Sequence, residues 1–358
     1  MRAAAAETRG RAPTLVLSTS AELEQISAEW LDLATGLPDV SYFATPDWVL
    51  SWWNTLGRDA AGRVGVWRDT DGRLQAVVPL GLVRHRLHPR LPIAVRVCTN
   101  LGSGAGAADH CGWAVLPERA ADVRAWMADL ARRRPLLLSN LDPDSGVSFG
   151  PEGARTVGTT DCPRIDIPPD PDAIGSSVKF RKQLRAYRRK IERLGITFRW
   201  VPPQQMTIDV LAQVVDLHAR RAAAAGWAST FTADRVALHR VLLDRADAGR
   251  GPACVLAERD GVAVAALYGF RWSDTFAYYQ TGWDAELADA NLATVLVAEA
   301  IRMAGADGAT VFDFLRGAES YKYRFGAVDR VDSSRLVPAG LAGALLSAKY
   351  RIRDRREP

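Results

Sequence analysis

The sequence predicts a mixed α/β (α+β) fold made of two units of the same kind, each a mixed, twisted sheet flanked by helices. Residues 64–83 and 254–270 each contain two apolar, β-branched runs joined by Asp-Gly, which is the pattern of a β-hairpin. Around each hairpin the predicted elements follow one order: helix, helix, hairpin, strand, helix, strand. A stretch rich in Pro, Gly, Asp and Ser separates the two halves at 151–176. Two copies of one α/β unit account for these observations.

The N-terminal half begins with helical spacing of apolar residues over about 22–34 and 46–56. Thr45 is expected to cap the second helix, with Pro46 at its first position. The hairpin is followed by strand-like runs, a helical stretch and a further apolar run. These later elements are expected at 93–98, 113–116, 117–134 and 136–141.

The C-terminal half repeats this order. Helices are expected near 208–225 and 233–247, the second capped by Thr232. A strand at 276–283, a helix near 292–304 and a strand at 310–315 follow the hairpin. The expected organisation is a disordered tail at 1–13, an N-terminal unit at 14–150, a linker at 151–176, a C-terminal unit at 177–335 and a basic C-terminal helix or tail at 336–358.

The composition is that of an ordinary globular protein, with 48% hydrophobic and 24% charged residues. No run of 18 apolar residues predicts a membrane span, and residues 1–13 lack the apolar core of a signal peptide. We therefore expect a cytoplasmic protein. The net charge of +5 permits an anionic ligand. The four cysteines are scattered, so we expect no disulfide framework and no metal site.

Residues 178–195 predict a strongly basic helix, with Ser176 or Ser177 as its N-cap and Gly195 at its end. Its remaining surface carries eight cations and one acid. A solvated surface helix and a helix that contacts an anion or nucleic acid are both open interpretations. The apolar residues that share one stripe are Phe180, Leu184, Tyr187, Ile191 and Leu194.

Three segments carry a family resemblance. The helix sequence KFRKQLRAYRRKIERLG follows the Pro-rich linker, FDFLRGAESYKYRFGA occupies 312–327, and SYFATPDWVLSWWNTLG lies near the N-terminus. Together they resemble the BioF2-like (CelD-type) branch of the GNAT acyltransferases, which are related to the Fem transferases. The resemblance covers about residues 20–330 and implies two tandem GNAT-like units. Its most specific part is RGxxxYKxxFG, formed by Arg316, Gly317, Tyr321, Lys322, Phe325 and Gly326.

The resemblance implies transfer of an acyl group from acetyl-CoA or another acyl-CoA to an amine of a small molecule or of a sugar or peptide precursor. In such folds the donor's pantetheine pairs between splayed strands, and its diphosphate rests on the start of the next helix. That helix begins here with Asn291, Leu292, Ala293 and Thr294. The sequence departs from the family in having no glycine between Trp283 and Gly305.

Direct acyl transfer needs a proton acceptor for the amine and a proton or positive field for the leaving thiolate. Tyr279, in an alternating strand, is a candidate proton donor, and core packing is its alternative role. Asp313 interrupts an apolar strand, so it is expected to act as a base or amine anchor, or to pair with Arg316 or Arg324.

Residues 321–325 also alternate, which predicts a strand with Tyr321, Tyr323 and Phe325 on one face and Lys322 and Arg324 on the other. This second face is expected to meet a substrate anion, or else to protect a sheet edge. Lys322 is the candidate catalytic cation because the family motif includes it. Arg316, Glu319 and Arg324 are candidate substrate contacts.

The N-terminal unit is expected to lack donor binding. Its Gly/Ala-rich stretch 100–113 has no phosphate-loop spacing and predicts a flexible surface loop. Asp109 and His110 in this loop are candidate acceptor contacts.

Two other functions compete with acyl-CoA transfer. A Fem-like enzyme would take an aminoacyl group from charged tRNA, held through the basic helix at 178–195. A non-catalytic partner of a polysaccharide-synthesis machine would have lost donor binding altogether. The sequence does not predict the acceptor or the oligomeric state.

Overall fold

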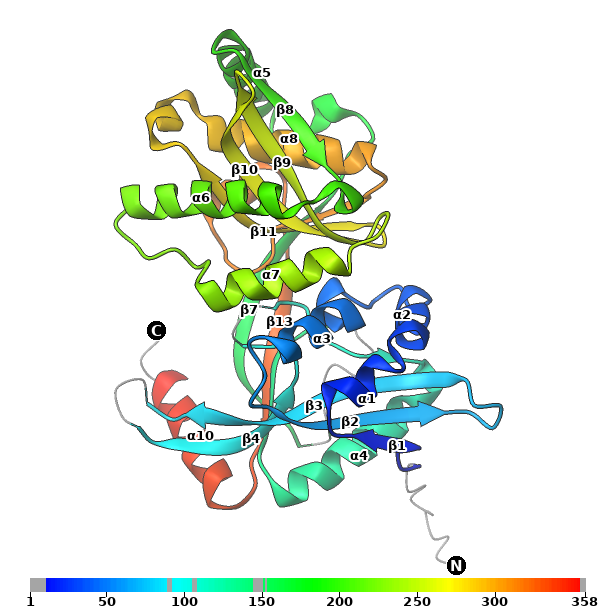
Figure 1. The fold of residues 1–358 in the computed structure, drawn as a ribbon. Coiled ribbons are helices and arrows are strands. Elements are labelled where there is room, and N and C mark those ends of the chain that lie inside the picture. The colour runs from blue at the N-terminus through cyan, green and yellow to red at the C-terminus, as the bar shows by residue number, and fades with distance from the viewer. Residues whose placement is uncertain (1–10, 89–91, 105–107, 144–150, 152, 355–358) are drawn as a thin grey trace, which may run out of the picture. The chain divides into compact units, whose positions relative to one another are not determined.

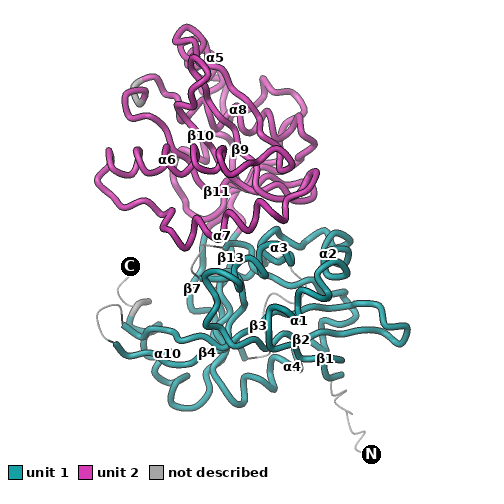
Figure 2. Tube along the Cα trace, in the orientation of Figure 1, with its two compact units in different colours: residues 1–160, 331–358 teal, residues 161–330 magenta. Residues whose placement is uncertain are grey.

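The computed structural model describes residues 11–88, 92–104, 108–143, 151 and 153–354, so most of the predicted tail lies outside the described residues. The chain forms two compact units, shown in Figure 2. Unit 1 contains residues 1–160 and 331–358, and unit 2 contains residues 161–330. Two strands, β7 (Arg155–Asp166) and β13 (Val328–Val337), run from one unit into the other.

Unit 1 has a mixed sheet in the order β1-β2-β3-β4-β6-β13. The first four strands are antiparallel, β4 and β6 are parallel, and β6 and β13 are antiparallel. A short strand, β5 (Ala114–Val115), pairs with β3 outside this order. The other strands are β1 (Leu15–Leu17), β2 (Ala61–Arg68), β3 (Leu74–Arg86), β4 (Ala94–Asn100) and β6 (Leu136–Leu141).

The helices of unit 1 pack on this sheet through apolar side chains. Met127 of α4 (Ala120–Arg133) is buried with Leu80 and Leu136, and Leu346 of α10 (Gly340–Asp354) is buried with Val97 and Leu137. The expected helix at 22–34 is broken into two pieces. The N-terminal helices are α1 (Ser20–Glu24), α2 (Ser27–Thr35), the 3₁₀ turn η1 (Tyr42–Ala44) and α3 (Pro46–Asn54), with the 3₁₀ turn η2 (Pro117–Arg119) before α4.

Unit 2 has a mixed sheet in the order β7-β12-β11-β10-β9-β8. Its strands are antiparallel except for the parallel pair β11 and β12. The bounds are β8 (Ile196–Val201), β9 (Gly251–Arg259), β10 (Val262–Trp272), β11 (Thr275–Trp283) and β12 (Val311–Asp313).

Helices cover both faces of the sheet of unit 2. Figure 1 shows α6 (Ile208–Ala224) and α7 (Ala233–Asp244) in front of the sheet, while α5 (Val178–Arg193) and α8 (Leu292–Ala306) pack on its other face. None of the helices that the structure describes is long and apolar enough to cross a membrane. The short elements are η3 (Pro171–Ala173), η4 (Pro203–Gln205), η5 (Ala285–Ala290) and α9 (Ser320–Arg324).

The two units share one chain order, as the sequence predicts. Three antiparallel strands lead through a helix to a strand that pairs in parallel with the third: β2-β3-β4-α4-β6 in unit 1 and β9-β10-β11-α8-β12 in unit 2. α-Helices precede the three strands in each case: α1, α2 and α3 in unit 1, and α6 and α7 in unit 2. The prediction of two mixed α/β units is therefore confirmed.

Several local signals acted as expected. The side chains of Ser177 and Thr232 accept N-cap hydrogen bonds at the starts of α5 and α7. Asp260 and Gly261 in the second hairpin turn both have positive φ, at 51° and 77°. Thr45 holds the N-cap position of α3, but its hydroxyl donates to the carbonyl of Tyr42 instead of capping the helix.

The segment 151–176 is not irregular throughout. Its composition predicts a linker, but β7 occupies Arg155–Asp166 and pairs with β12 inside unit 2. Apolar residues such as Val157, Cys162 and Ile165 are buried there, and this burial outweighs the turn-forming residues on either side.

Helix α6 lies directly against the backbone of β11. A Cβ built on Gly282 would stand 2.2 Å from the backbone nitrogen of His218. There is therefore no room for a side chain at residue 282. Glycine at this position allows α6 to approach the end of β11 this closely.

Gly282→Ala is expected to lower the thermal stability of unit 2, because overpacking of this kind costs about 1–3 kcal/mol. Gly36→Ala is the matched control, since its Cβ would meet no atom closer than 3.6 Å. Thermal melts followed by circular dichroism compare both variants with the parent. An unchanged melt for Gly282→Ala would contradict the close approach of α6.

Candidate active site

The two parallel strands of unit 2 pair only briefly. Thr275–Ala277 of β11 pair with Val311–Asp313 of β12, after which β12 ends and β11 continues to Trp283. Among the residues that the structure describes, no strand pairs with this edge of β11 beyond Ala277. Backbone groups at such an edge can bond an extended ligand as an added strand, apart from the carbonyl of Thr281, which accepts from Arg221.

A β-bulge at Tyr279 reshapes the same stretch of β11. Tyr278 lies opposite Gly269 and Gln280 lies opposite Tyr268, so Tyr279 is the extra residue. The predicted alternation is wrong here, because Tyr279 and Gln280 contact His239 of α7 and His218 of α6. Tyr278 contacts Phe312 and Phe314 on the opposite face.

Tyr279 belongs to an aromatic cluster rather than to the open edge. Its ring centroid lies 5.2–5.3 Å from those of Phe270 and His239. The hydroxyl of Tyr268 meets Nδ1 of His239 at 3.0 Å, and burial lowers the pKa of His239 to about 3. A neutral imidazole in an apolar cluster favours core packing as the role of Tyr279.

Asp313 turns the chain where β12 ends. Its carboxylate oxygen Oδ1 accepts a 2.7 Å hydrogen bond from the N–H of Leu315, whose φ is 55°. The side chain is buried, as the sequence predicts. The carboxylate thus stabilises a left-handed residue immediately after the strand, and it directs the chain away from β11.

The segment 320–325 is the clearest correction of the sequence prediction. It forms the short helix α9 and not a strand, so Lys322 and Arg324 do not share a face. Lys322 is buried, while Arg324 is exposed, with its guanidinium 4.3 Å from the ring centre of Phe180. An alternation of aromatic and basic residues over only five positions fits both the two-residue period of a strand and the 3.6-residue period of a helix.

Lys322 binds the chain's own carbonyl oxygens. Its Nζ donates to the carbonyls of Leu315, Arg316 and Gly317 at 3.2, 2.8 and 2.8 Å. It also forms an ion pair of 2.9 Å with Glu319. An ammonium has three protons, and these four oxygens occupy them. This geometry gives Lys322 the role of holding the turn after β12, and it leaves no proton for a substrate anion.

A cationic and aromatic cluster stands at the open edge of β11. Arg221 of α6 donates from Nη1 to the carbonyl oxygen of Thr281 at 3.1 Å. Its guanidinium carbon lies 3.9 Å from the ring centre of Trp283 and 5.6 Å from that of Trp227. Burial lowers the pKa of Arg221 below its usual value.

Two tyrosines complete this cluster. The hydroxyls of Tyr278 and Tyr321 are hydrogen-bonded to each other, and both lie in the field of Arg221. Burial raises the pKa of each phenol, and Glu319 raises both further. These hydroxyls therefore stay protonated at neutral pH, and Tyr278 is also hydrogen-bonded to the side chain of Thr281.

The candidate donor residues lie at the start of α8. Asn291 is in the left-handed conformation, with φ 60°, and takes the place that glycine often holds before a helix. Leu292 is buried, whereas Ala293 and Thr294 are partly exposed. No acceptor from the described part of the chain meets the N–H groups of Leu292 and Ala293. This helix end can accept an anion.

In unit 1 the two parallel strands, β4 and β6, also separate after a brief pairing, but there residues of the same unit form hydrogen bonds where the strands separate. Strands β4 and β6 pair only at Cys98 and Leu136. The side-chain amide of Asn100 then bonds both backbone groups of Ser139, at 2.9 and 3.1 Å. Further along, Cys111 forms a parallel bridge with Leu141. The edge of β6 is thus taken up by the chain.

The expectation of a flexible surface loop is wrong for Asp109 and His110. Both side chains are buried, at 1% and 4% exposure. The Nδ1 and backbone N–H of His110 meet the carboxylate of Asp332 at 2.9 and 2.6 Å. Neither side chain is exposed to solvent, and the His110–Asp332 contacts tie residues 108–111 to β13.

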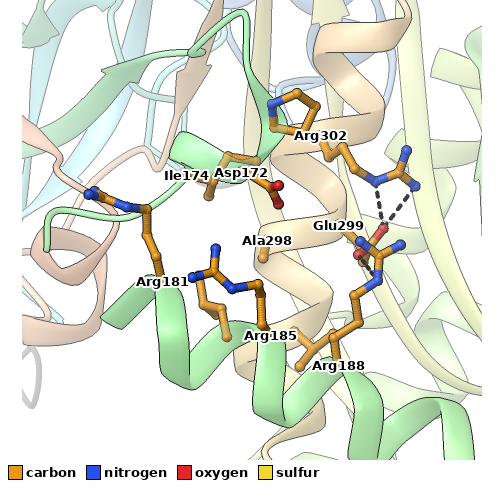
Figure 3. A pocket seen from close by; sticks show the side chains of 11 residues that line it. Asp172, Ile174, Arg181, Arg185, Arg188, Ala298, Glu299 and Arg302 are labelled. Atoms are coloured by element: carbon orange, nitrogen blue, oxygen red, sulfur yellow. Dashed lines mark hydrogen bonds and ion pairs between the residues drawn. The ribbon is translucent and has the colours of Figure 1, made fainter. Parts of the chain in front are cut away.

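A separate pocket of about 70 Å³ lies between α5 and α8. Figure 3 shows arginines from both helices around it, with Glu299 between Arg188 and Arg302. Arg188 Nε and Arg302 Nη2 lie 3.3 and 2.8 Å from the carboxylate of Glu299. The cationic side chains that line the pocket are Arg181, Arg185, Arg188 and Arg302, and Asp172 is the second acid.

Sequence reasoning found part of this site. It named Glu319, Asp313 and the start of α8, but it missed Arg221, Trp283 and Tyr278. Arg221 lies in a helix rich in alanine and arginine, where a solvated role is the ordinary expectation. No local signal distinguishes it from Arg220, because only the packing of α6 on β11 brings one of the two to the strand edge.

Lys322→Met is expected to destabilise unit 2, because three carbonyl oxygens lose their donor while the side-chain volume is nearly kept. The loss should be about 2–4 kcal/mol in unfolding free energy. Chemical denaturation measures it, with Arg324→Met as the exposed control two residues away. Equal stability of Lys322→Met and the parent would contradict the turn-holding role.

Comparisons with known proteins agree with this geometry. Residues 178–323 match the model of an acetyltransferase (GNAT) domain. No curated protein matches the chain. Among solved structures, FemX is 11% identical, with a TM-score of 0.63, over 90% of this chain and 98% of that chain.

Two further structures share the fold at low identity. One is the C-terminal domain of a putative lysylphosphatidylglycerol synthetase from Agrobacterium fabrum, 12% identical with a TM-score of 0.57, covering 93% of this chain and 96% of that one. The other is L-PGS from Bacillus licheniformis, 12% identical with a TM-score of 0.51, covering 86% and 96%. Residues 178–323 of this chain therefore match a GNAT acetyltransferase domain, and the fold of the chain is shared with FemX.

Proposed function

We propose that the protein is an N-acyltransferase of the BioF2-like branch, which moves an acyl group from acyl-CoA to an amine. The observation that carries this proposal is the short pairing of β11 and β12, which leaves the edge of β11 open beside the free start of α8. Acetyl-CoA is the first donor to test, because the matching family model is that of an acetyltransferase.

The donor would lie along β11 in unit 2. Its pantetheine amides would pair with the open edge, and its diphosphate would rest at the N–H groups of Leu292 and Ala293. In unit 1 the corresponding strand β4 ends at Asn100, whose side-chain amide bonds the backbone of Ser139 in β6. We therefore propose one donor site in each chain.

The transfer requires no covalent enzyme intermediate. The neutral amine nitrogen attacks the thioester carbonyl carbon, a C–N bond forms, and the C–S bond breaks. The nitrogen loses one proton to solvent and the leaving thiolate gains one. Solvent is the proposed proton source for the thiolate, because burial raises the pKa of Tyr278 and Tyr321 and makes both phenols weak acids. Asp313 and Lys322 are positioning residues, because they hold the turn that ends β12.

Isothermal calorimetry with acetyl-CoA and longer acyl-CoAs tests the donor. Ala293→Glu should raise the Kd at least about tenfold, because a carboxylate at the helix start repels the diphosphate while favouring the helix. Ala233→Glu, at the start of α7, is the matched control and should change the Kd by less than about twofold.

Three results of these experiments would contradict different parts of the proposed function. Failure of the folded parent to bind any acyl-CoA would overturn the CoA donor. Equal Kd values for Ala293→Glu and Ala233→Glu would remove the diphosphate from α8. Binding without release of CoA for any amine would favour the non-catalytic alternative.

A Fem-like transfer from aminoacyl-tRNA is the second candidate function. The observation that favours it is the basic surface of α5, where Arg185 has no hydrogen bond or ion pair to any described residue. Lysines and arginines on one helix are suited to the phosphates of RNA.

Filter binding of tRNA at increasing salt tests this candidate. If α5 contacts phosphates, Arg185→Gln with Arg189→Gln should weaken binding and reduce the salt slope by about two. Arg133→Gln with Arg134→Gln in unit 1 is the matched control. An absence of tRNA binding at low salt would exclude this donor.

A further inference from the structure

Arg221 is a cation without an acidic partner in the part of the chain that the structure describes. It is partly buried in unit 2, and no carboxylate of a described residue forms an ion pair with it. Its one hydrogen bond within the described chain goes to the carbonyl of Thr281. Its guanidinium carbon lies 3.9 Å from the ring centre of Trp283 and 5.6 Å from that of Trp227, and Tyr278 and Tyr321 act on its charge electrostatically.

The neighbouring arginine shows what an ordinary surface cation does in the same helix. Arg220 is exposed and pairs with Asp216 at 3.0 Å and with Asp284 at 3.4 Å. The acids near this end of α6 therefore serve Arg220. Arg221 instead gives up hydration without gaining a counter-charge, which is costly unless another anion supplies it.

We propose that Arg221 binds a carboxylate of the acceptor, so that the acceptor is an amine that also carries a carboxylate, as an amino acid does. This inference rests on the proposed function, and it names the substrate class for the same site. The planar guanidinium presents paired N–H groups that match a carboxylate.

The charge of the cluster favours a carboxylate over a phosphate. Arg221 is the unpaired cation of this cluster among the described residues, because the neighbouring Arg220 pairs with Asp216 and Asp284. Lys322 is occupied by carbonyl oxygens and Glu319. One cation is matched by a monoanion, whereas phosphate dianions in proteins are usually met by several donors or by a helix end. The start of α8 is the position suited to the donor's diphosphate.

The aromatic walls add to the strength of the pair. Trp283 stacks on the guanidinium and limits the water that reaches it, which strengthens an ion pair with a ligand. Trp227 is 39% exposed, a large apolar side chain left at the surface beside Arg221. An acceptor with an apolar side chain beside its carboxylate would cover it.

Matched pairs of amines test the proposal: leucine with 3-methylbutylamine, phenylalanine with phenethylamine, and lysine with cadaverine. Binding is measured by calorimetry, and turnover by thiol release from the acyl-CoA that binds. The parent should prefer at least one acid over its decarboxylated partner by about tenfold or more. Arg221→Gln should reduce that preference below about threefold by weakening the acid alone.

Two further variants serve as controls for the effect of Arg221→Gln. Arg220→Gln is the matched control and should keep the preference of the parent. Arg221→Lys keeps the positive charge without the planar fork and should give an intermediate preference, which also serves if Arg221→Gln does not fold. The Kd for acyl-CoA is measured on every variant and should change by less than about twofold.

Several outcomes would overturn the proposal. These are equal binding of acids and amines by the parent, an equal loss of both in Arg221→Gln, and no binding of any acid up to about 20 mM. A raised Kd for acyl-CoA in Arg221→Gln would assign the anion to the donor instead. Since acyl-CoA binding is measured separately, failure of the donor proposal is distinguished from failure of the carboxylate proposal.

Discussion

The early end of hydrogen bonding between β11 and β12 is the constraint on which the site of unit 2 depends. The strands pair as far as Ala277 and Asp313, and Asp313 then bonds the N–H of Leu315 to turn the chain away. Lys322 fixes the other side of that turn by bonding three carbonyl oxygens in a row. The edge of β11 stays open because buried polar groups hold the neighbouring chain in place, and a buried group that loses its partner is costly.

The same architecture serves different ends in the two units. Each has three antiparallel strands, a helix and a parallel strand that pairs only briefly. In unit 1 the gap is closed by Asn100, whose side-chain amide bonds the backbone of Ser139, and by the bridge at Cys111. In unit 2 it is bordered by Arg221 and two tyrosines. The two units thus share the same arrangement of strands and helices, but different side chains lie where their parallel strands separate.

The sequence predicted the fold more fully than the site. Apolar periodicity and the Asp-Gly turns located most elements, and Ser177 and Thr232 cap their helices as expected. The prediction was wrong at 321–325, where the short pattern fits a helix as well as a strand. It was also wrong at Tyr279, where the extra residue of a β-bulge changes the face of the sheet on which the side chain lies. Linker composition at 151–176 also concealed β7, because strand pairing depends on partners distant in sequence.

The sequence by itself determined the order of elements, the helix caps, the basic surface of α5 and the burial of Asp313. These follow from local propensity and spacing, which act over a few residues. Only the tertiary structure decided that Lys322 serves the chain's own carbonyls, that Tyr278 and not Tyr279 borders the open edge, and that Arg221 has no acidic partner among the described residues. The contacts of Lys322, Tyr278 and Arg221 depend on residues that sheet pairing and helix packing bring together. A local sequence pattern does not predict which distant residues come into contact.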